Sequence, residues 1–315
     1  MNKQEKIQSF DPSGIGLKSN NLFGLPFNFD ESEIVVLPVP WEVTVSYGSG
    51  TSQAPLQILN SSFQVDLYDI DNPDAWQKGI FLLDISDSVF QKSEQLRART
   101  KEIINLLENG ASPNHKTIES STALINAEAE EMNSWVYENM SKIIAAGKFP
   151  VLLGGDHSTP LGFYRALGNK FGTFGILQID AHADLRKAYE GFTYSHASIM
   201  YNALALESVR KLVQIGIRDV CKEEVDFINN SNGRVKVFYD QQVQQKKYEG
   251  HTWDAICHDV ISELPELVHL SFDVDGMDPK LCPTTGTPVP GGMDFYEIIH
   301  LVKCLKAGGK KNNRL

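Results

Sequence analysis

Cysteine is scarce in this sequence, and the few cysteines lie far apart. The chain has 4 cysteines among its 315 residues, and no two of them form a CxxC pair. They are Cys221, Cys257, Cys282 and Cys304. This spacing argues against a zinc ribbon and against a dithiol redox motif. It fits a protein kept in a reducing, intracellular compartment.

Long apolar runs are also absent. No stretch has the roughly 20 consecutive apolar residues that a membrane-spanning helix needs. Residues 1–16 (MNKQEKIQSFDPSGIG) contain no apolar segment of the kind found in a signal peptide. We therefore expect a cytoplasmic protein without a membrane partner.

Positive charge is outweighed by negative charge. Lys and Arg number 29 against 40 Asp and Glu, which gives a formal net charge of -11. Such a field repels nucleic acid and anionic membrane surfaces and attracts cations. We therefore expect no nucleic-acid partner. With 42% hydrophobic and 22% charged residues, the composition is that of an ordinary packed domain.

The order of the apolar segments predicts the fold class. Residues 1–30 are polar and interrupted by proline and glycine, which predicts an irregular N-terminal arm before a single domain over 31–315. Strands that are apolar on both faces and alternate with helices indicate an α/β protein with a mainly parallel sheet covered on both sides. The predicted strands are 34–40, 79–85, 149–155, 173–180, 211–217, 235–240 and 267–275.

The stretch from about 85 to 125 has a different character. Helical spacing is present at 93–110 and again at 123–147. The segment between them, ASPNHKTIESS, is hydrophilic and is expected to form a loop. We interpret this stretch as a lid or a subunit contact.

Acidic residues and histidines follow three of the predicted strands. GGDHS (154–158), DAHAD (180–184) and DVDGMDP (273–279) each begin where an apolar run ends. Ligands of such sheets bind beyond the carboxyl ends of the strands, so the three segments are expected to converge. Residues two apart in an extended segment share a face. The side chains expected on one rim are His157, Asp180, His182, Asp184, Asp273 and Asp275.

This group of side chains predicts a metal site. Carboxylates that face one another repel and resist ionisation unless cations neutralise them. A mixture of carboxylate and imidazole suits manganese, zinc, iron or nickel better than magnesium or calcium, which prefer oxygen ligands. A single DxH or DxD at a strand end is commonly a cap or a solvent-facing group, so it is the convergence of three such segments that favours metal. Asp156 is interpreted instead as an acceptor that anchors the loop around His157.

Several segments together resemble the signatures of the ureohydrolase family, which includes arginases, agmatinases and guanidinobutyrases. They are GGDHS, DAHADL, YEGFTYSHA, and SFDVDGMDP followed by TTGTPVPGG. The resemblance runs from PVPWEVTVSYGSGTSQAP through residue 309. It implies an arginase-like three-layer α/β/α fold and two divalent metal ions, Mn2+ first, with Ni2+, Fe2+ or Zn2+ as alternatives. It also implies a homo-oligomer, either a trimer or a hexamer.

The resemblance assigns roles by motif position. One ion would be held by His157, Asp180, Asp184 and Asp273, and the other by Asp180, His182, Asp273 and Asp275. Asp180 and Asp273 would therefore bridge the two ions. A hydroxide between the ions would attack the guanidinium carbon, with Asp184 orienting it. His196 matches the family's proton-shuttling histidine; the alternative is that it caps the helix ASIMYNALAL.

The loop after DAHAD indicates the substrate class. LRKAYEGFTYSHA resembles agmatinases and lacks the Asn/Ser-rich loop with which arginases bind amino and carboxylate groups. This implies hydrolysis of a small cationic guanidine compound, such as agmatine, to urea and an amine. Arginine, guanidinobutyrate, free guanidine and formiminoglutamate remain alternative substrates, because one or two methylenes change pocket contacts by only about 1–3 kcal/mol.

The family pattern extends further than this sequence. It implies a buried strand with a glutamate that hydrogen-bonds the substrate guanidinium, followed by a terminal helix, and both would lie beyond Leu315. On this interpretation the C-terminal strand and helix are missing. The alternative of another class is therefore a catalytically impaired paralogue with a metal-binding regulatory or scaffold role. The complete ligand set and His196 favour an enzyme.

Overall fold

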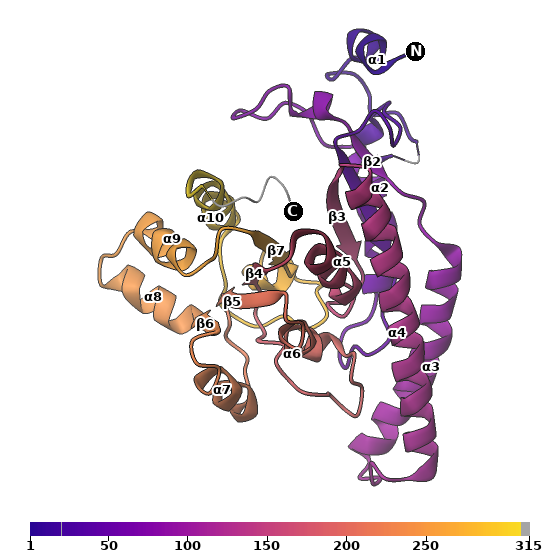
Figure 1. Cartoon of the computed structure of the whole chain (residues 1–315), viewed down its shortest axis with the longest axis vertical. Coiled ribbons are helices and arrows are strands. Elements are labelled where there is room, and N and C mark those ends of the chain that lie inside the picture. The colour runs from indigo at the N-terminus through magenta and orange to yellow at the C-terminus, as the bar shows by residue number, and fades with distance from the viewer. Residues whose placement is uncertain (20, 310–315) are drawn as a thin grey trace.

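The computed structural model describes residues 1–19 and 21–309, which form two parallel sheets flanked by helices (Figure 1). The first sheet has the order β2-β1-β3 and the second the order β6-β5-β4-β7. The strands of the first sheet are β1 (Ile34–Val39), β2 (Ile80–Leu82) and β3 (Phe149–Gly154). Those of the second are β4 (Phe174–Ile179), β5 (Val209–Ile215), β6 (Val235–Phe238) and β7 (Val268–Phe272).

Six of the seven apolar runs identified in the sequence contain one of these strands, and the run at 211–217 overlaps β5, which begins earlier, at Val209. The predicted α/β class is confirmed. The division into two sheets was not predicted. Among the described strands, β3 and β7 are edge strands that pair with β1 and β4 but not with each other. Side chains link the two sheets instead. His157 after β3 lies with Nε2 2.9 Å from Ser271 Oγ on β7, and the Tyr164 hydroxyl donates to the same oxygen over 3.1 Å.

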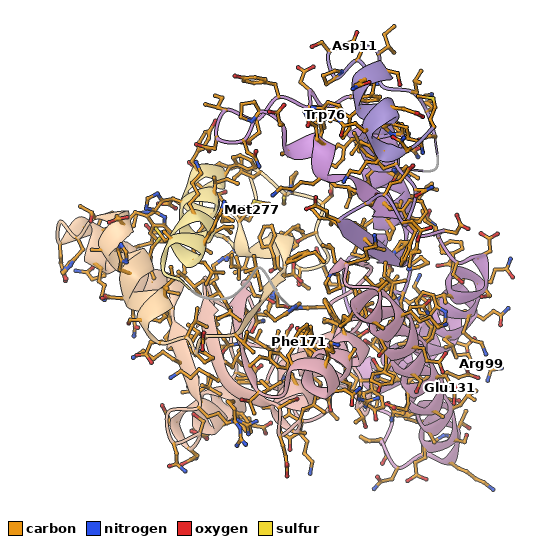
Figure 2. The ribbon with its side chains drawn as sticks, turned by 45° about the horizontal axis from the view of Figure 1, so that its top comes forward. Asp11, Trp76, Arg99, Glu131, Phe171 and Met277 are labelled. Atoms are coloured by element: carbon orange, nitrogen blue, oxygen red, sulfur yellow. The ribbon has the colours of Figure 1, made fainter. Side chains whose placement is uncertain are left out.

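Helices cover both sheets (Figure 1). Two long helices, α3 and α4, run along one side of the molecule, and α7, α8 and α9 lie around the second sheet. Arg99 of α3 and Glu131 of α4 lie together on the outer side, away from Met277 in the loop after β7 (Figure 2). The helices are α1 (Lys3–Ser9), α2 (Ala54–Ser62), α3 (Asp87–Glu108), α4 (Lys116–Ala145), α5 (Leu161–Phe171), α6 (Ile199–Leu204), α7 (Lys222–Asn229), α8 (Asp240–Tyr248), α9 (Trp253–Ser262) and α10 (Phe295–Ala307).

The N-terminal arm is less irregular than predicted. It contains the helix α1, which a capping box begins: the Asn2 side chain accepts from the Glu5 N–H, and the Glu5 side chain accepts from the Asn2 N–H. This exchange satisfies two backbone donors that a helix start leaves free. The pattern Asn-x-x-Glu was therefore a readable helix signal in the sequence.

The hydrophilic segment after α3 is also more helical than predicted. The loop covers only 109–115, because α4 already begins at Lys116. Ile118 is buried, seven residues before Ile125 and fourteen before Met132, so it extends the apolar stripe of α4 by two turns. Whether this region is a lid or a subunit contact stays a prediction.

The main core lies where α4 and α5 pack on the sheets. The two helices approach closely because residue 162 is glycine: a Cβ there would lie 2.1 Å from the carbonyl oxygen of Asn133. A second cluster fills the space between the β4–β7 sheet and the helices α9 and α10. None of the described helices combines the length and the apolarity needed to cross a bilayer.

His269 in β7 makes the fold sensitive to acid. Its ring meets Phe163 and Tyr164 edge-on at 5.0 and 5.2 Å, and burial lowers its pKa to about 4. Below about pH 6.5 the unfolded chain binds a proton at His269 that the folded chain does not. The contribution of neutral His269 to the free energy of unfolding is therefore complete above about pH 6.5 and is lost as the pH falls toward 4. The free energy of unfolding should therefore fall between pH 7 and pH 4, and we expect this fall to be smaller by on the order of 2 kcal/mol in His269→Phe. Urea unfolding across this range, with the exposed His251→Phe as control, measures it; an unchanged pH dependence would refute it.

Candidate metal centre

The loop after β3 places His157. Gly155 donates to the Val39 carbonyl over 3.0 Å and Asp156 to the Trp41 carbonyl over 2.9 Å, so the loop folds back on the end of β1. A Cβ on Gly155 would lie 1.9 Å from the Trp41 oxygen, which requires glycine at this position. The buried Asp156 accepts from the Ser158 N–H over 2.8 Å. Asp156 thus anchors the loop, as predicted.

His157 is surrounded by carboxylates from two other strand ends. Its Nδ1 lies 2.9 Å from Asp180 Oδ2, 2.9 Å from Asp184 Oδ2 and 3.5 Å from Asp273 Oδ2. Asp184 reaches this position with a positive φ of 53°, a conformation that is uncommon for residues other than glycine. The convergence predicted from the three motifs is therefore found at this point.

A second group forms around His182. Its Nδ1 lies 3.1 Å from Asp275 Oδ2 and 3.6 Å from Asp180 Oδ1. Two sets of potential ligands, each with its donor atoms within 4.8 Å of one another, therefore share Asp180. They are His157, Asp180 and Asp184, and Asp180, His182 and Asp275. Asp273 belongs to neither set but lies beside the first.

Three of the four carboxylates have raised pKa values, whereas His157 and His182 lower the pKa of Asp180. Burial and the charge of Asp180 raise the pKa of Asp184 to about 7. Burial, Asp275 and Asp180 raise that of Asp273 well above its usual value. Burial alone would lower the pKa of His182, but Asp180 and Asp275 raise it to about 11. So many acidic groups in one place resist full ionisation unless cations are supplied.

The geometry fits a metal better than a hydrogen-bond network. His157 Nδ1 is buried and has no hydrogen-bond partner among residues 1–19 and 21–309, although two carboxylate oxygens lie 2.9 Å away. A buried polar atom without a partner is costly. Coordination of an ion by this nitrogen and the surrounding oxygens would remove that cost.

A row of buried polar side chains supports the ligands and was missed in the sequence. Gln178, Gln214 and Ser271 are paired across β5, β4 and β7 in the sheet register. Gln178 donates to Asp180 Oδ2 over 2.7 Å and accepts from Gln214 over 2.5 Å. Ser271 holds the far nitrogen of His157. A glutamine inside each of two apolar runs, GILQI and LVQI, was the available signal.

Loss of this support is expected to weaken metal binding. We predict that Gln178→Met, which keeps the volume and removes the donor, lowers Mn2+ affinity by about 10–100-fold, the usual effect of an outer hydrogen-bond partner. Calorimetric titration of the metal-free chain measures it, with Gln242→Met on the exposed side of α8 as control. Equal affinities for the variant and the control would show that Gln178 does not orient the ligand.

His196 lies across a small cavity from the ligands. The cavity has a volume of about 120 Å3, and His182, Asp184 and His196 all line it. His196 Nδ1 lies 3.3 Å from Ser195 Oγ and 3.4 Å from Thr44 Oγ1. Burial, followed by the charges of His182 and His157, lowers its pKa to about 4. The alternative cap role is not seen, because the Ser195 side chain caps the helical turn that His196 begins.

Arg218 organises the loop after β7, a role that the sequence did not reveal. Its guanidinium donates to the carbonyls of Asp275 (2.6 Å), Met277 (3.1 Å) and Val289 (2.9 Å). Arg218 therefore joins Asp275, a potential metal ligand, to Met277 and Val289, the two ends of the segment that follows.

Glu42 organises the loop that follows β1, and the sequence did not reveal this role either. It is buried and accepts from the N–H groups of Gly50 (2.7 Å) and Ser52 (3.0 Å). The two loops meet where Gly48 donates to the Gly286 carbonyl over 2.9 Å. The glutamate that the family resemblance implies for guanidinium binding falls outside the described residues.

Comparison with known proteins gives a consistent family. The chain is 29% identical over 279 residues to an N(1)-aminopropylagmatine ureohydrolase of Thermus thermophilus, covering 88% of this chain and 79% of that protein. It is 27% identical over 280 residues to an agmatinase of Bacillus anthracis, covering 86% and 78%. The crystal structure of agmatine ureohydrolase of Thermoplasma volcanium matches with a TM-score of 0.69 at 23% identity, covering 93% of this chain and 84% of that one. A model of the arginase family matches residues 32–312, and the chain therefore belongs to the arginase family.

Proposed function

We propose that this chain is a binuclear metal hydrolase that cleaves a small cationic guanidine compound, of the agmatine type, to urea and an amine. The observation that carries the proposal is the pair of ligand sets that share Asp180. Two ions a few ångströms apart are a recurrent arrangement for hydrolysis, because they hold and activate water between them. The relatives named agmatinase and N(1)-aminopropylagmatine ureohydrolase support the substrate class.

We assign the ligands to two ions and propose manganese as the preferred metal. One ion would be held by His157, Asp180, Asp184 and Asp273, and the other by Asp180, His182, Asp273 and Asp275. When bound, such a pair of cations lowers the pKa of water enough to supply a hydroxide nucleophile near neutral pH. Asp273 would complete both sets from its position 3.5 Å from His157 Nδ1.

The protein groups then position the reactants and carry the proton. Asp184 lines the cavity and can accept a hydrogen bond from the attacking water, which fixes its direction. His196 is neutral at pH 7 because its pKa is low. With Nδ1 held beside two hydroxyls, the other ring nitrogen, Nε2, would take the proton of the attacking water and pass it to the leaving nitrogen as the C–N bond breaks.

The charges around the cavity favour a cationic substrate. Asp184, Asp219 and Glu224 line it, with Arg186 as a positive group. Asp219 is exposed at the cavity, where it can meet a distal ammonium group. A substrate carboxylate would be repelled by these acids. We therefore place agmatine and its aminopropyl derivative ahead of arginine.

The test is a urea assay of the manganese-loaded chain. The panel contains agmatine, N(1)-aminopropylagmatine, guanidinobutyrate, arginine and guanidine, each repeated with nickel. We expect urea from agmatine or from N(1)-aminopropylagmatine, and less from arginine. If metal is bound and no member of the panel yields urea, the hydrolase proposal fails and a metal-binding scaffold becomes the better description.

A further inference from the structure

A second cluster of potential ligands lies between α9 and α10, outside the site described above. Cys257 is on α9, and His300 and Cys304 are on α10. Donor atoms of the three side chains lie within 4.8 Å of one another. Residues four apart on a helix share a face, so His300 and Cys304 present both ligands to the same neighbour.

A fourth donor borders this cluster. Asp254, one turn before Cys257 on α9, lies with Oδ1 2.9 Å from His300 Nε2 and 3.7 Å from Cys304 Sγ. The donor set is thus two sulfurs, one imidazole nitrogen and one carboxylate oxygen from two packed helices. Buried cysteines often serve only as small apolar residues. A histidine near both thiols and a carboxylate beside that of Cys304 are not explained by apolar packing.

The burial pattern gives the cluster an inner and an outer part. Cys257 is fully buried and Cys304 is 7% exposed, whereas the side chains of His300 and Asp254 are 41% and 58% exposed. An ion can therefore enter from solvent on the side of the two polar residues and meet the thiols beneath. Such an entry path is one requirement of a metal site.

We propose that Cys257, Cys304, His300 and Asp254 bind one zinc ion that fastens α10 to α9. Zinc takes sulfur, nitrogen and oxygen ligands in a tetrahedron, with Zn–S distances of about 2.3 Å, which places donor atoms roughly 3.3–3.8 Å apart. The 3.7 Å between Asp254 Oδ1 and Cys304 Sγ already lies in this range, and the exposed side chains of His300 and Asp254 can adjust around an ion. The absence of a CxxC pair argued against a zinc ribbon. Two packed helices bring these ligands together without such a pair.

Binding releases two protons. Burial raises the pKa of both thiols, so Cys257 and Cys304 are protonated when metal-free. Each exchanges its proton for a bond to the ion and becomes a thiolate. The ion would also fasten the middle and last turn of α10, where His300 and Cys304 lie. This site does not depend on the proposed hydrolysis.

Cobalt spectroscopy separates this site from the catalytic one. The test uses the full chain, metal-free and reduced, with Asp180→Asn to disable the catalytic ligands. Thiolate bound to Co2+ gives an intense near-ultraviolet charge-transfer absorption that oxygen and nitrogen ligands do not give. We expect this absorption to saturate at one equivalent of cobalt and to disappear when zinc is added.

Matched variants identify the ligands. Cys257→Ser is expected to abolish the absorption, whereas Cys221→Ser and Cys282→Ser retain it. His300→Gln changes a half-exposed residue, leaves the core intact, and is expected to weaken zinc binding by more than about tenfold. This second variant keeps the test valid if Cys257→Ser does not fold. No absorption in a chain whose thiols are shown to be reduced, or an absorption that survives both Cys257→Ser and His300→Gln, would overturn the proposal.

Discussion

Replacement of Asp180 by asparagine is expected to abolish binding of both ions and to reduce urea formation by more than about a hundredfold. Asp180 contacts both histidines of the site and belongs to both sets of ligands. Loss of an outer hydrogen-bond partner alone costs about 10–100-fold in metal affinity or activity. A residue that would bridge the two ions has a larger effect, because its loss opens both coordination shells.

The same variant has an informative effect on the metal-free chain. The charge of Asp180 helps to raise the pKa values of Asp184, Asp273 and Asp275. Its removal relieves this repulsion but also ends the pairing with His157 and His182 that lowers the pKa of Asp180. We therefore expect the clearest change to be loss of the rise in Tm that Mn2+ produces. Asp226→Asn, an exposed carboxylate on α7, is the control. A variant that still shows the metal-dependent rise in Tm would contradict the assignment of Asp180.

Replacement of His196 by asparagine is expected to lower kcat by about 10²–10⁴-fold, the usual contribution of a positioned acid or base. Metal binding should remain unchanged, because no described contact joins His196 directly to the ligands. KM should change little, since the proton is moved only in the chemical steps. Steady-state kinetics with agmatine measures the effect, and calorimetry checks the metal content.

The exposed His251→Asn serves as the control for the loss of a histidine as such. Added imidazole is expected to restore part of the activity of His196→Asn, because it can carry the missing proton. A variant with normal kcat would show that water reaches the leaving nitrogen without this histidine. A rise in KM together with a loss of metal would instead indicate a structural role.

The strand-end motifs allowed most of the site to be predicted. Buried parallel strands are apolar on both faces, so a histidine or an acid at the point where such a run stops is conspicuous in the sequence. GGDHS, DAHAD and DVDGMDP stand out in this way, and the structure brings their side chains together around His157 and His182.

What could not be predicted depends on contacts distant in sequence. Arg218 holds backbone carbonyls 57 to 71 residues away, which no local pattern records. The pair Gln178 and Gln214 was visible as two polar residues in apolar runs, but its meaning depends on the register between β4 and β5. The division into two sheets likewise follows from which strands pair, and apolar periodicity alone does not determine pairing.

Anomalous X-ray diffraction from crystals of the manganese-loaded chain would locate the bound ions directly. We expect two peaks beside Asp180, one next to His157 and the other next to His182, with Asp180 and Asp273 in contact with both. A single peak at this position, or manganese bound elsewhere with none beside Asp180, would contradict this expectation.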